Sequence, residues 1–353
     1  MKAAVWHTAK DVQVEQRAEP GPPGPDEALV EVAYCGICGT DLHEYVDGPH
    51  FIPHDQAGAA APAILGHEFC GTVLAVGGPG GRVKPGDRVA VHPAQYCQQC
   101  RYCQSGMVQL CNQASWLGLG GAWGGLAQRA VVKQYQCFLL PESVSFEQGA
   151  LVEPAAVTRQ GVSRGGVQPG DVVLVTGGGP IGQLAALNAR AAGAREVYLS
   201  EVVPVRRELA ARNAEPDRVF DPARENVPEL VRALTGGDGV DVAIEAAGNE
   251  RALHDALAAT RKDGTVVQIA IHGRPVSLHP ALELTIPARR LIGSLGYTPR
   301  DYEHVIGLMA AGKLPAERLI TSVIPLEDLI ELGMDDLVRP DTRNVKILVK
   351  PSA

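Results

Sequence analysis

Residues 35–43 place several chemically reactive side chains within nine positions of one another. Cys38 offers a thiolate, which is a soft metal ligand, and Thr40 adds a hydroxyl two residues later. Asp41 can orient a metal-bound histidine, and His43 can pass a proton to solvent. Short cysteine–glycine runs also occur in ordinary turns, so this stretch suggests a metal-assisted redox site that other parts of the chain must support.

A second group of cysteines has the spacing C-x2-C-x2-C-x7-C, and its members are Cys97, Cys100, Cys103 and Cys111. Four thiolates within fifteen residues suit one tetrahedral zinc ion, with Zn–S distances of about 2.3 Å. Because such a site leaves no position for a substrate, the spacing predicts a structural zinc that stabilises a lobe with little core of its own. A zinc knuckle for nucleic acid is an alternative that the acidic composition disfavours.

A glycine-rich turn predicts a dinucleotide site. It follows an apolar run at 171–176, typical of a buried parallel strand, and precedes an Ala/Leu-rich helix expected to end near Ala192. Gly177 permits the tight turn, Gly179 lets the backbone approach a pyrophosphate, and Gly182 lets the helix pack closely. Pro180 and Ile181 open the helix, whose free N–H groups would bind the pyrophosphate. A plain strand–helix turn is the alternative interpretation.

The next predicted strand, 196–200, is followed by an acid that bears on the choice of cofactor. Glu201 stands nineteen residues after Gly182 and is placed to accept bonds from the adenosine ribose hydroxyls. Its charge would repel a 2′-phosphate, so the sequence favours NAD over NADP. Arg206 is near enough to accept that phosphate, which keeps NADP as the alternative.

A catalytic metal site would need residues that are far apart in sequence. His67 and Glu68 lie on a predicted turn before a strand, and Glu153 stands where the β-rich segment ends and a cleft is expected. With Cys38 they provide a thiolate, an imidazole and one or two carboxylates, which leaves zinc an open position. Such an ion would polarise a carbonyl or hold an alkoxide beside a nicotinamide. Taken singly, His67 also fits a buried core histidine, and Glu68 a capping group.

Two kinds of element must position these residues. Residues 1–34 alternate apolar and polar positions around a Pro/Gly loop, which is typical of β strands, and 44–62 is expected to be a long surface loop. From about residue 155, strands alternate with helices as in a doubly wound α/β fold with a parallel sheet. The last strand, 345–349, is expected to return to the first domain. We therefore predict a catalytic β domain over 1–154 with a zinc lobe at about 92–115, a nucleotide domain over 155–296, and a return segment over 297–353.

The composition excludes several classes of protein. The 353 residues suffice for about two domains, and 45% hydrophobic with 20% charged residues is ordinary for a globular protein. No run approaches the ~18 apolar residues of a membrane helix, and the N-terminus does not resemble a secretory signal, so we expect a cytoplasmic protein. A net charge of −8 argues against a nucleic-acid partner. Eight cysteines are too few for a disulfide scaffold and indicate metal ligands instead.

Taken together, these motifs resemble the zinc-dependent medium-chain alcohol dehydrogenase family over nearly the whole chain. The resembling segments are 38–43, 66–68, the four-cysteine lobe, 153–154, 177–182 and Glu201. Within the family, 42–45 with 48–49, 296–298 and 319–321 are most similar to the 2,3-butanediol dehydrogenase branch. Sorbitol and threonine dehydrogenases are close relatives.

The resemblance implies a GroES-like catalytic domain, a Rossmann NAD-binding domain, one catalytic and one structural zinc per chain, and a homodimer or homotetramer. It implies Cys38 and His67 as ligands of the catalytic zinc, with Glu68 or Glu153 completing the shell as the ion shifts. It also implies a relay in which the alcohol proton passes through the Thr40 hydroxyl and the nicotinamide ribose to His43.

We therefore expect an NAD- and zinc-dependent oxidoreductase acting on a small secondary alcohol or vicinal diol and its ketone, of the 2,3-butanediol/acetoin type. A sorbitol-like polyol or L-threonine dehydrogenase is the alternative within enzymes. A nucleotide-binding scaffold without turnover is disfavoured because the metal and relay residues are all present. One segment departs from the butanediol branch: bulky residues and a histidine usually follow the Glu-Pro pair, whereas this chain has Arg159 and Gln160 in a stretch that bears on the substrate.

Overall fold

The structure is a computed structural model that describes residues 1–55, 58–78 and 81–352. The chain divides into two compact units, which are described separately. The first unit comprises Met1–Glu153, Thr298–Ala310 and Ile320–Ala353, and the second comprises Pro154–Tyr297 and Ala311–Leu319. None of the helices in the described ranges is both long and apolar enough to cross a membrane.

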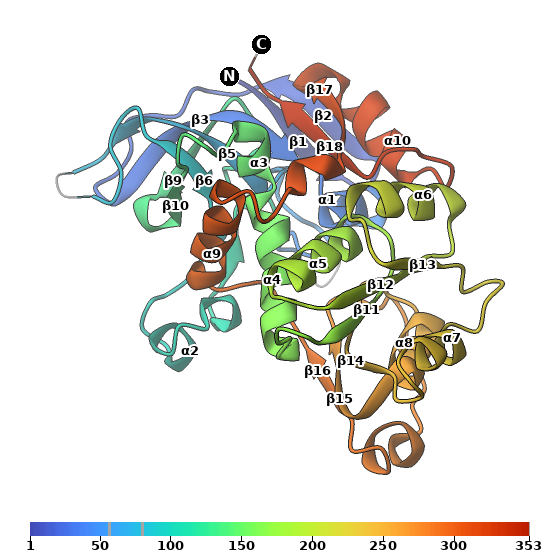
Figure 1. Ribbon diagram of the computed structural model, residues 1–353. Helices are drawn as coiled ribbons and strands as arrows, with labels where there is room; N and C mark the ends of the chain where they lie inside the picture. The colour runs from blue at the N-terminus through green and yellow to red at the C-terminus, as the bar shows by residue number, and fades with distance from the viewer. Residues whose placement is uncertain (56–57, 79–80, 353) are drawn as a thin grey trace. The chain divides into compact units, whose positions relative to one another are not determined.

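The first unit is built on β strands (Figure 1). Its larger sheet has the order β10-β6-β5-β3-β18-β17, with β9 also paired to β3, and a smaller sheet has the order β2-β1-β4. The bounds are β1 (Lys2–Thr8), β2 (Asp11–Gln16), β3 (Glu27–Gly36), β4 (Ala63–Ile64), β5 (Glu68–Val76), β6 (Arg88–Val91), β9 (Arg129–Lys133), β10 (Cys137–Leu139), β17 (Ile320–Pro325) and β18 (Lys346–Lys350). In β3, alternate residues Ala28, Val30 and Val32 are fully buried, as a strand with one face on the core requires.

The last strand joins the first unit, as the sequence predicts. β18 runs antiparallel to β3, with Val349 opposite Cys35, and parallel to β17. This pairing brings the start of β18 beside the end of β3, where the reactive stretch of the sequence begins.

The helix α1 (Gly39–Asp47) carries most of that stretch, and Cys38 is its N-cap residue. The Cys38 backbone N–H donates to the Asp41 carboxylate at 3.0 Å, which satisfies one of the free donors of the first turn. The expectation of a surface loop from residue 44 is wrong for 44–47, because the helix continues to Asp47. Residues 56–57 of that expected loop lie outside the described residues.

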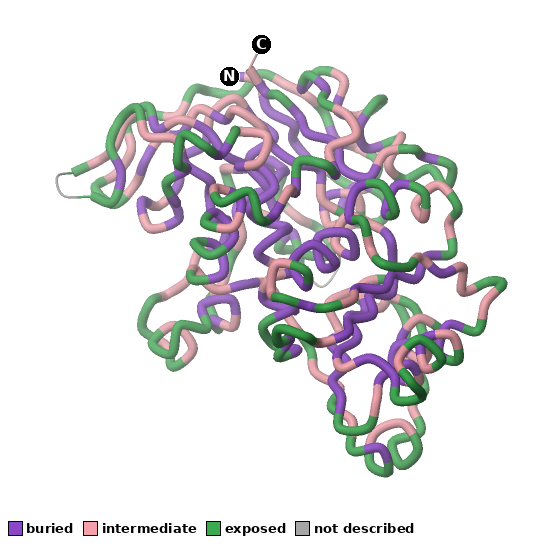
Figure 2. Tube along the Cα trace, in the orientation of Figure 1, coloured by how far each residue is buried: buried purple, intermediate pink, exposed green. Residues whose placement is uncertain are grey.

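The second unit contains a parallel sheet of strand order β13-β12-β11-β14-β15-β16. Its strands are β11 (Val172–Thr176), β12 (Glu196–Ser200), β13 (Arg218–Phe220), β14 (Val240–Glu245), β15 (Thr260–Gln268) and β16 (Arg290–Gly293). Figure 2 shows the central strands β11 and β12 as buried. Parallel strands covered on both faces are expected to be nearly continuous apolar runs, and the first four residues of β11 are all apolar.

Both faces of this sheet carry helices. Val172 and Leu174 of β11 pack in one cluster with residues of α7 (Val227–Leu234) and α8 (Glu250–Ala259). Val175 points to the other face, where the start of α5 (Pro180–Ala191) lies close to it. The doubly wound α/β class predicted from the sequence is therefore confirmed for this unit.

The remaining helices and short strands of the two units are as follows. The helices are α2 (Arg101–Gln104), α3 (Phe146–Ala150), α4 (Val152–Gly165), α6 (Pro204–Asn213), α9 (Pro299–Ala310) and α10 (Asp335–Val338). The short strands are β7 (Ala94–Gln95) and β8 (Ser115–Trp116). Short helical turns are η1 (Val108–Leu110), η2 (Gln134–Gln136), η3 (Ala281–Thr285), η4 (Ala316–Leu319), η5 (Leu326–Asp328) and η6 (Leu329–Met334).

Candidate active site and cofactor sites

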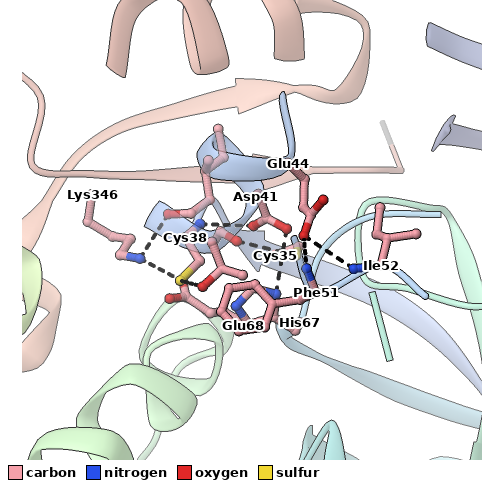
Figure 3. A network of polar contacts seen from close by, with 12 residues as sticks. Cys35, Cys38, Asp41, Glu44, Phe51, Ile52, His67, Glu68 and Lys346 are labelled. Carbon is pink, nitrogen blue, oxygen red and sulfur yellow. Dashed lines mark hydrogen bonds and ion pairs between the residues drawn. The ribbon is translucent and has the colours of Figure 1, made fainter. Parts of the chain in front are cut away.

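Three of the predicted metal ligands meet in the first unit. One ligand atom each of Cys38, His67 and Glu68 lies within 4.8 Å of the others (Figure 3). Cys38 is the N-cap residue of α1, and Glu68 is the first residue of β5. His67 lies in the turn between β4 and β5, so the shape of that turn determines its position. Gly66 makes that turn with φ +95°, and a Cβ there would stand 2.6 Å from the backbone nitrogen of Leu126. Only glycine fits this position without strain.

Asp41 is fully buried behind His67. Its Oδ1 lies 3.5 Å from His67 Nδ1, and the described residues give neither atom a hydrogen bond. Burial alone would lower the pKa of His67, but the negative charges of Asp41 and Cys38 outweigh it and raise that pKa well above its usual range. The Nδ1 nitrogen therefore faces a carboxylate, which leaves the other ring nitrogen as the one available to an ion.

The sequence reasoning missed Lys346, the first residue of β18. Its ammonium donates to the Glu68 carboxylate at 2.6 Å and to the Ile37 carbonyl at 2.9 Å. Burial lowers the pKa of Lys346, yet Glu68 and then Cys38 outweigh that effect, and the pKa is raised. A lysine interrupting an otherwise apolar final strand was the signal in the sequence, because such a charge needs a buried partner.

The remaining predicted residues lie around this cluster. Thr40 Oγ1 is 3.7 Å from the Cys38 sulfur, and His43 lies exposed about one turn into α1. Glu153 is buried, and its charge acts on Lys346 and Tyr302. Within the described residues, Glu153 is not part of the compact group formed by Cys38, His67 and Glu68. The structure thus brings the thiolate, the imidazole and one of the two carboxylates together.

The four cysteines of the lobe also come together, each with a sulfur within 4.8 Å of the others. The sulfurs of Cys97 and Cys111 are 3.5 Å apart, and those of Cys100 and Cys103 are 3.6 Å apart. Backbone amides point at them, and the Cys103 amide lowers the pKa of Cys100 to about 6. Gln136 fixes the start of the lobe by donating to the carbonyls of residues 92, 93 and 94 at 2.9–3.3 Å.

A cavity of about 440 Å³ opens at the carboxyl ends of β11, β12 and β14 in the second unit. Gly177 has φ +103°, and a Cβ on Gly182 would stand 1.8 Å from the Gly177 oxygen, so both glycines are required by the tight turn. Gly179 lines the cavity, and a Cβ there would meet open space. α5 begins directly after Gly179, and its first N–H groups lie at this end of the cavity.

Glu201 and Arg206 both line this cavity. The Glu201 carboxylate is buried and accepts the N–H of Gly178 at 2.6 Å and of Val203 at 2.7 Å. These bonds hold the acid at the end of β12, beside the glycine turn. Its charge therefore faces the region where the sequence places the adenosine ribose.

Comparisons with known proteins agree with this geometry. Residues 24–142 match the model of the alcohol dehydrogenase GroES-like domain, and residues 180–311 match that of the zinc-binding dehydrogenases. The chain is 39% identical to (R,R)-butanediol dehydrogenase of Bacillus subtilis over 100% of both chains, and 33% identical to sorbitol dehydrogenase of the same organism, covering 100% of this chain and 98% of the relative. The crystal structure of 2R,3R-butanediol dehydrogenase from Bacillus subtilis superposes with a TM-score of 0.91 at 38% identity, covering 99% of each chain.

The chain belongs to the zinc-binding alcohol dehydrogenases. It is an NAD-dependent enzyme that acts on small-molecule alcohols, and it combines a GroES-like domain with a Rossmann-type sheet. The family resemblance expected from the sequence is therefore confirmed.

The side chains of this dehydrogenase fit the cofactors of its family. Cys38, Asp41 and Glu68 concentrate negative charge in a buried space, and this charge raises the pKa values of both His67 and Lys346. A site that favours cations in this way suits a divalent metal. The four lobe thiols offer a complete tetrahedral donor set, and the open space at Gly179 leaves room for a pyrophosphate.

Proposed function

We propose that this dehydrogenase interconverts 2,3-butanediol and acetoin with NAD as the hydride acceptor. The observation that carries the proposal is the meeting of Cys38, His67 and Glu68 beside the Thr40 hydroxyl, in a chain 39% identical to a butanediol dehydrogenase. Oxidation removes a hydride from the carbinol carbon and a proton from its hydroxyl. Different residues bind the metal, transfer the proton and hold the cofactor that accepts the hydride.

Cys38 and His67 would hold the catalytic zinc, with Glu68 as the carboxylate that the cluster contains and Glu153 as the second acid nearby. The bound zinc supplies a Lewis acid that favours the alkoxide over the alcohol. Asp41 fixes the ring of His67 by facing its Nδ1, so the ring is pre-oriented before metal binds. Cys97, Cys100, Cys103 and Cys111 would hold the structural zinc.

Thr40 and His43 handle the alcohol proton in this proposal. The Thr40 hydroxyl lies beside the Cys38 sulfur, where it can accept a proton from an alcohol held at the metal site. His43 is exposed on the same helix, so its imidazole can exchange that proton with water.

Gly177, Gly179 and Gly182 would cradle the NAD pyrophosphate, with Pro180 and Ile181 at the start of α5. Glu201 would accept the ribose hydroxyls and repel the 2′-phosphate of NADP, because its charge is fixed beside the glycine turn. Arg206 lines the same cavity and is the residue that would accept a 2′-phosphate if Glu201 were removed.

A sorbitol-like polyol dehydrogenase is the second candidate, supported by the 33% identity to a sorbitol dehydrogenase and by the departure at Arg159 and Gln160. The metal and cofactor residues are the same for both reactions, so only the alcohol distinguishes them. A panel of 2,3-butanediol stereoisomers, sorbitol and L-threonine, with chiral analysis of products, tests the choice. A kcat/KM for sorbitol above that for every butanediol isomer would reverse it.

We also infer a homo-oligomer. β16 is the edge strand of the parallel sheet, and exposed apolar side chains cluster in sequence around it, namely Ile271, Leu282, Ile286 and Leu295. Pairing of this edge with a second copy would cover both the free backbone groups and the apolar side chains. A cytoplasmic location suits the free thiols of the lobe, which zinc binds only when reduced.

The variants Cys38→Ser and His67→Ala test the catalytic site. We expect each to lose one of two zinc ions per chain and to abolish turnover, while NADH binding, followed by fluorescence, is retained. Turnover that persists in either variant, with the metal demonstrably absent, would disprove the assignment.

A further inference from the structure

Three titratable side chains lie together at the solvent end of α1. The rings of His43 and His50 meet edge to face, with centroids 6.2 Å apart. The His50 Nε2 lies 2.9 Å from the Asp47 carboxylate. Asp47 follows His43 by four residues on α1, so the two share one face of the helix. His43 thus stands next to a carboxylate and a second imidazole.

Glu44 holds the segment that carries His50. Its fully buried carboxylate accepts the backbone N–H groups of three consecutive residues: His50 at 3.0 Å, Phe51 at 2.5 Å and Ile52 at 3.2 Å. A buried carboxylate bonded by three amides is a strong anchor, because each bond is charge-assisted. The chain after α1 is thereby folded back onto the helix that carries His43.

Three further features fix this arrangement. A Cβ on Gly48 would stand 2.5 Å from the Glu44 carboxylate and 2.6 Å from the Glu44 backbone oxygen, so the fold-back requires glycine there. The Trp6 indole N–H donates to the Glu44 carbonyl at 2.7 Å, and the Tyr45 hydroxyl donates to Asp335 at 2.7 Å. The second half of α1 is therefore held independently of the metal site at its first turn.

We propose that Asp47 and His50 form the solvent end of the proton path that runs through Thr40 and His43, and that Glu44 is the positioning residue that holds His50 in it. This inference rests on the proposed function. Oxidation of one alcohol delivers one proton to the His43 ring, which becomes an imidazolium. Asp47 stabilises that cation by its charge, and the proton then leaves to water, which restores the neutral ring.

The charged groups around His43 are consistent with this role. Asp47 faces it from α1, His50 from the following segment, and Lys10 reaches this area from the turn between β1 and β2. The hydrogen bond with His50 lowers the pKa of Asp47 despite some desolvation, and the charges of His50, His43 and Lys10 add smaller contributions in the same direction. A lowered pKa keeps the Asp47 carboxylate charged at neutral pH, so its charge is available to an imidazolium.

An NMR titration of the zinc-loaded enzyme labelled with 13C-histidine tests the proposal without relying on turnover. The His43 signal is assigned by its loss in His43→Gln. In Asp47→Asn, we expect the midpoint of the His43 titration to move to lower pH by about 0.3 unit, the size of an exposed i,i+4 charge interaction. Asp26→Asn is the matched control, because Asp26 is an exposed carboxylate of the same unit that pairs with Lys133.

Glu44 is tested with two variants. Glu44→Gln keeps Oε1, which can accept all three N–H groups, whereas Glu44→Ala removes both oxygens. We expect the ring-to-ring NOE between His43 and His50 to survive in the Gln variant and to vanish in the Ala variant. An NOE that survives in Glu44→Ala would overturn the assignment of Glu44 as a positioning residue, because His50 would then keep its place without the carboxylate.

The pH profile of kcat/KM for alcohol oxidation tests the same proposal on the working enzyme. Its His43-dependent limb should move to lower pH in Asp47→Asn by the same amount as the NMR midpoint, and not in Asp26→Asn. An unchanged midpoint in both measurements would overturn the proposal. Failure of the proposed substrate is distinguishable, because the wild-type enzyme would then oxidise another alcohol of the panel, and the same comparison would be made with that alcohol.

Discussion

The ammonium of Lys346 and the carboxylate of Glu68 form an ion pair of 2.6 Å, in which the side chains are only 2% and 1% exposed. The two residues are 278 positions apart in sequence. The pair therefore ties the last strand of the chain to a candidate ligand of the catalytic metal. It also explains why the C-terminal segment must return to the β-rich unit for the site to be complete.

Replacement of Lys346 by methionine should strongly destabilise the first unit. The Glu68 carboxylate would remain buried without its cation, which costs about 3–5 kcal/mol. Urea unfolding measures this, and Lys350→Met, at the exposed end of the same strand, is the matched control and should change stability by less than about 0.5 kcal/mol. Because the folded-state pKa of Lys346 is raised, the contribution of the Lys346–Glu68 ion pair to the free energy of unfolding is present throughout the neutral range. This contribution is lost only at alkaline pH. Equal stability of the two variants would contradict this account.

Removal of the Glu201 carboxylate should relax the cofactor preference. In Glu201→Ala, the ribose hydroxyls lose their acceptor and the 2′-phosphate loses a repelling charge. We expect the ratio of kcat/KM for NAD to that for NADP to fall at least about tenfold, equivalent to about 1.4 kcal/mol. Adding Arg206→Ala should then reduce the NADP activity that was gained. An unchanged ratio in Glu201→Ala would place the discrimination elsewhere.

Loss of Cys100 should affect stability more than chemistry. Its sulfur belongs to the group of four cysteine sulfurs, which lies apart from Cys38 in the sequence. Four thiolates would fill the coordination shell of a zinc ion and leave no position for a substrate. We expect Cys100→Ser to lower the zinc content by one ion and the melting temperature by about 5 °C or more, at about 2–4 °C per kcal/mol for a domain of this size. The kcat of the chains that remain folded should change less. A normal melting temperature with a lost kcat would make the lobe catalytic.

Buried His92 should make the first unit sensitive to mild acid. Burial lowers its pKa from 6.5 to about 3, and its ring packs between Phe138 and Tyr302. Since the unfolded chain binds this proton below pH 6.5 and the folded chain does not, stability is retained above that pH and decreases below it, by about 2 kcal/mol at pH 5. Urea unfolding at pH 7 and pH 5 should show this loss in the wild type, and His92→Phe should reduce it.

Replacement of an exposed histidine provides the comparison for that experiment. His279→Asn removes an imidazole from the surface of the second unit and should leave the difference between pH 7 and pH 5 unchanged. If the free energy of unfolding falls by the same amount between pH 7 and pH 5 in His92→Phe and in His279→Asn, the acid sensitivity belongs to other groups.

The local parts of the fold could be predicted from the sequence. β12 has the bounds 196–200 that the sequence predicts, and α5 ends within one residue of its expected end. The glycine turn was identifiable because its strain is encoded in the residue type: Gly177 needs its positive φ, and Gly182 has no room for a Cβ. Cys35, Cys70 and Cys137 are buried, as expected of small apolar residues.

The contacts that close the site could not be predicted, because they join segments that no local pattern relates. Lys346 reaches Glu68 only because β18 pairs with β3, and the register of that pairing is a property of the whole sheet. Glu44 looked like the start of a surface loop, since its buried role depends on three backbone amides rather than on any motif. The helix that contains it has only nine residues, fewer than the window of about 11–18 residues over which helical periodicity is read.

The most direct test of the central claim, that Cys38 and His67 share one catalytic zinc, is a crystal of the purified enzyme measured at the zinc absorption edge. We predict two anomalous peaks per chain. One should lie at the centre of Cys97, Cys100, Cys103 and Cys111, and the other within bonding distance, about 2.0–2.3 Å, of both the Cys38 sulfur and a ring nitrogen of His67. A fully occupied lobe site with no peak between Cys38 and His67 would contradict the account.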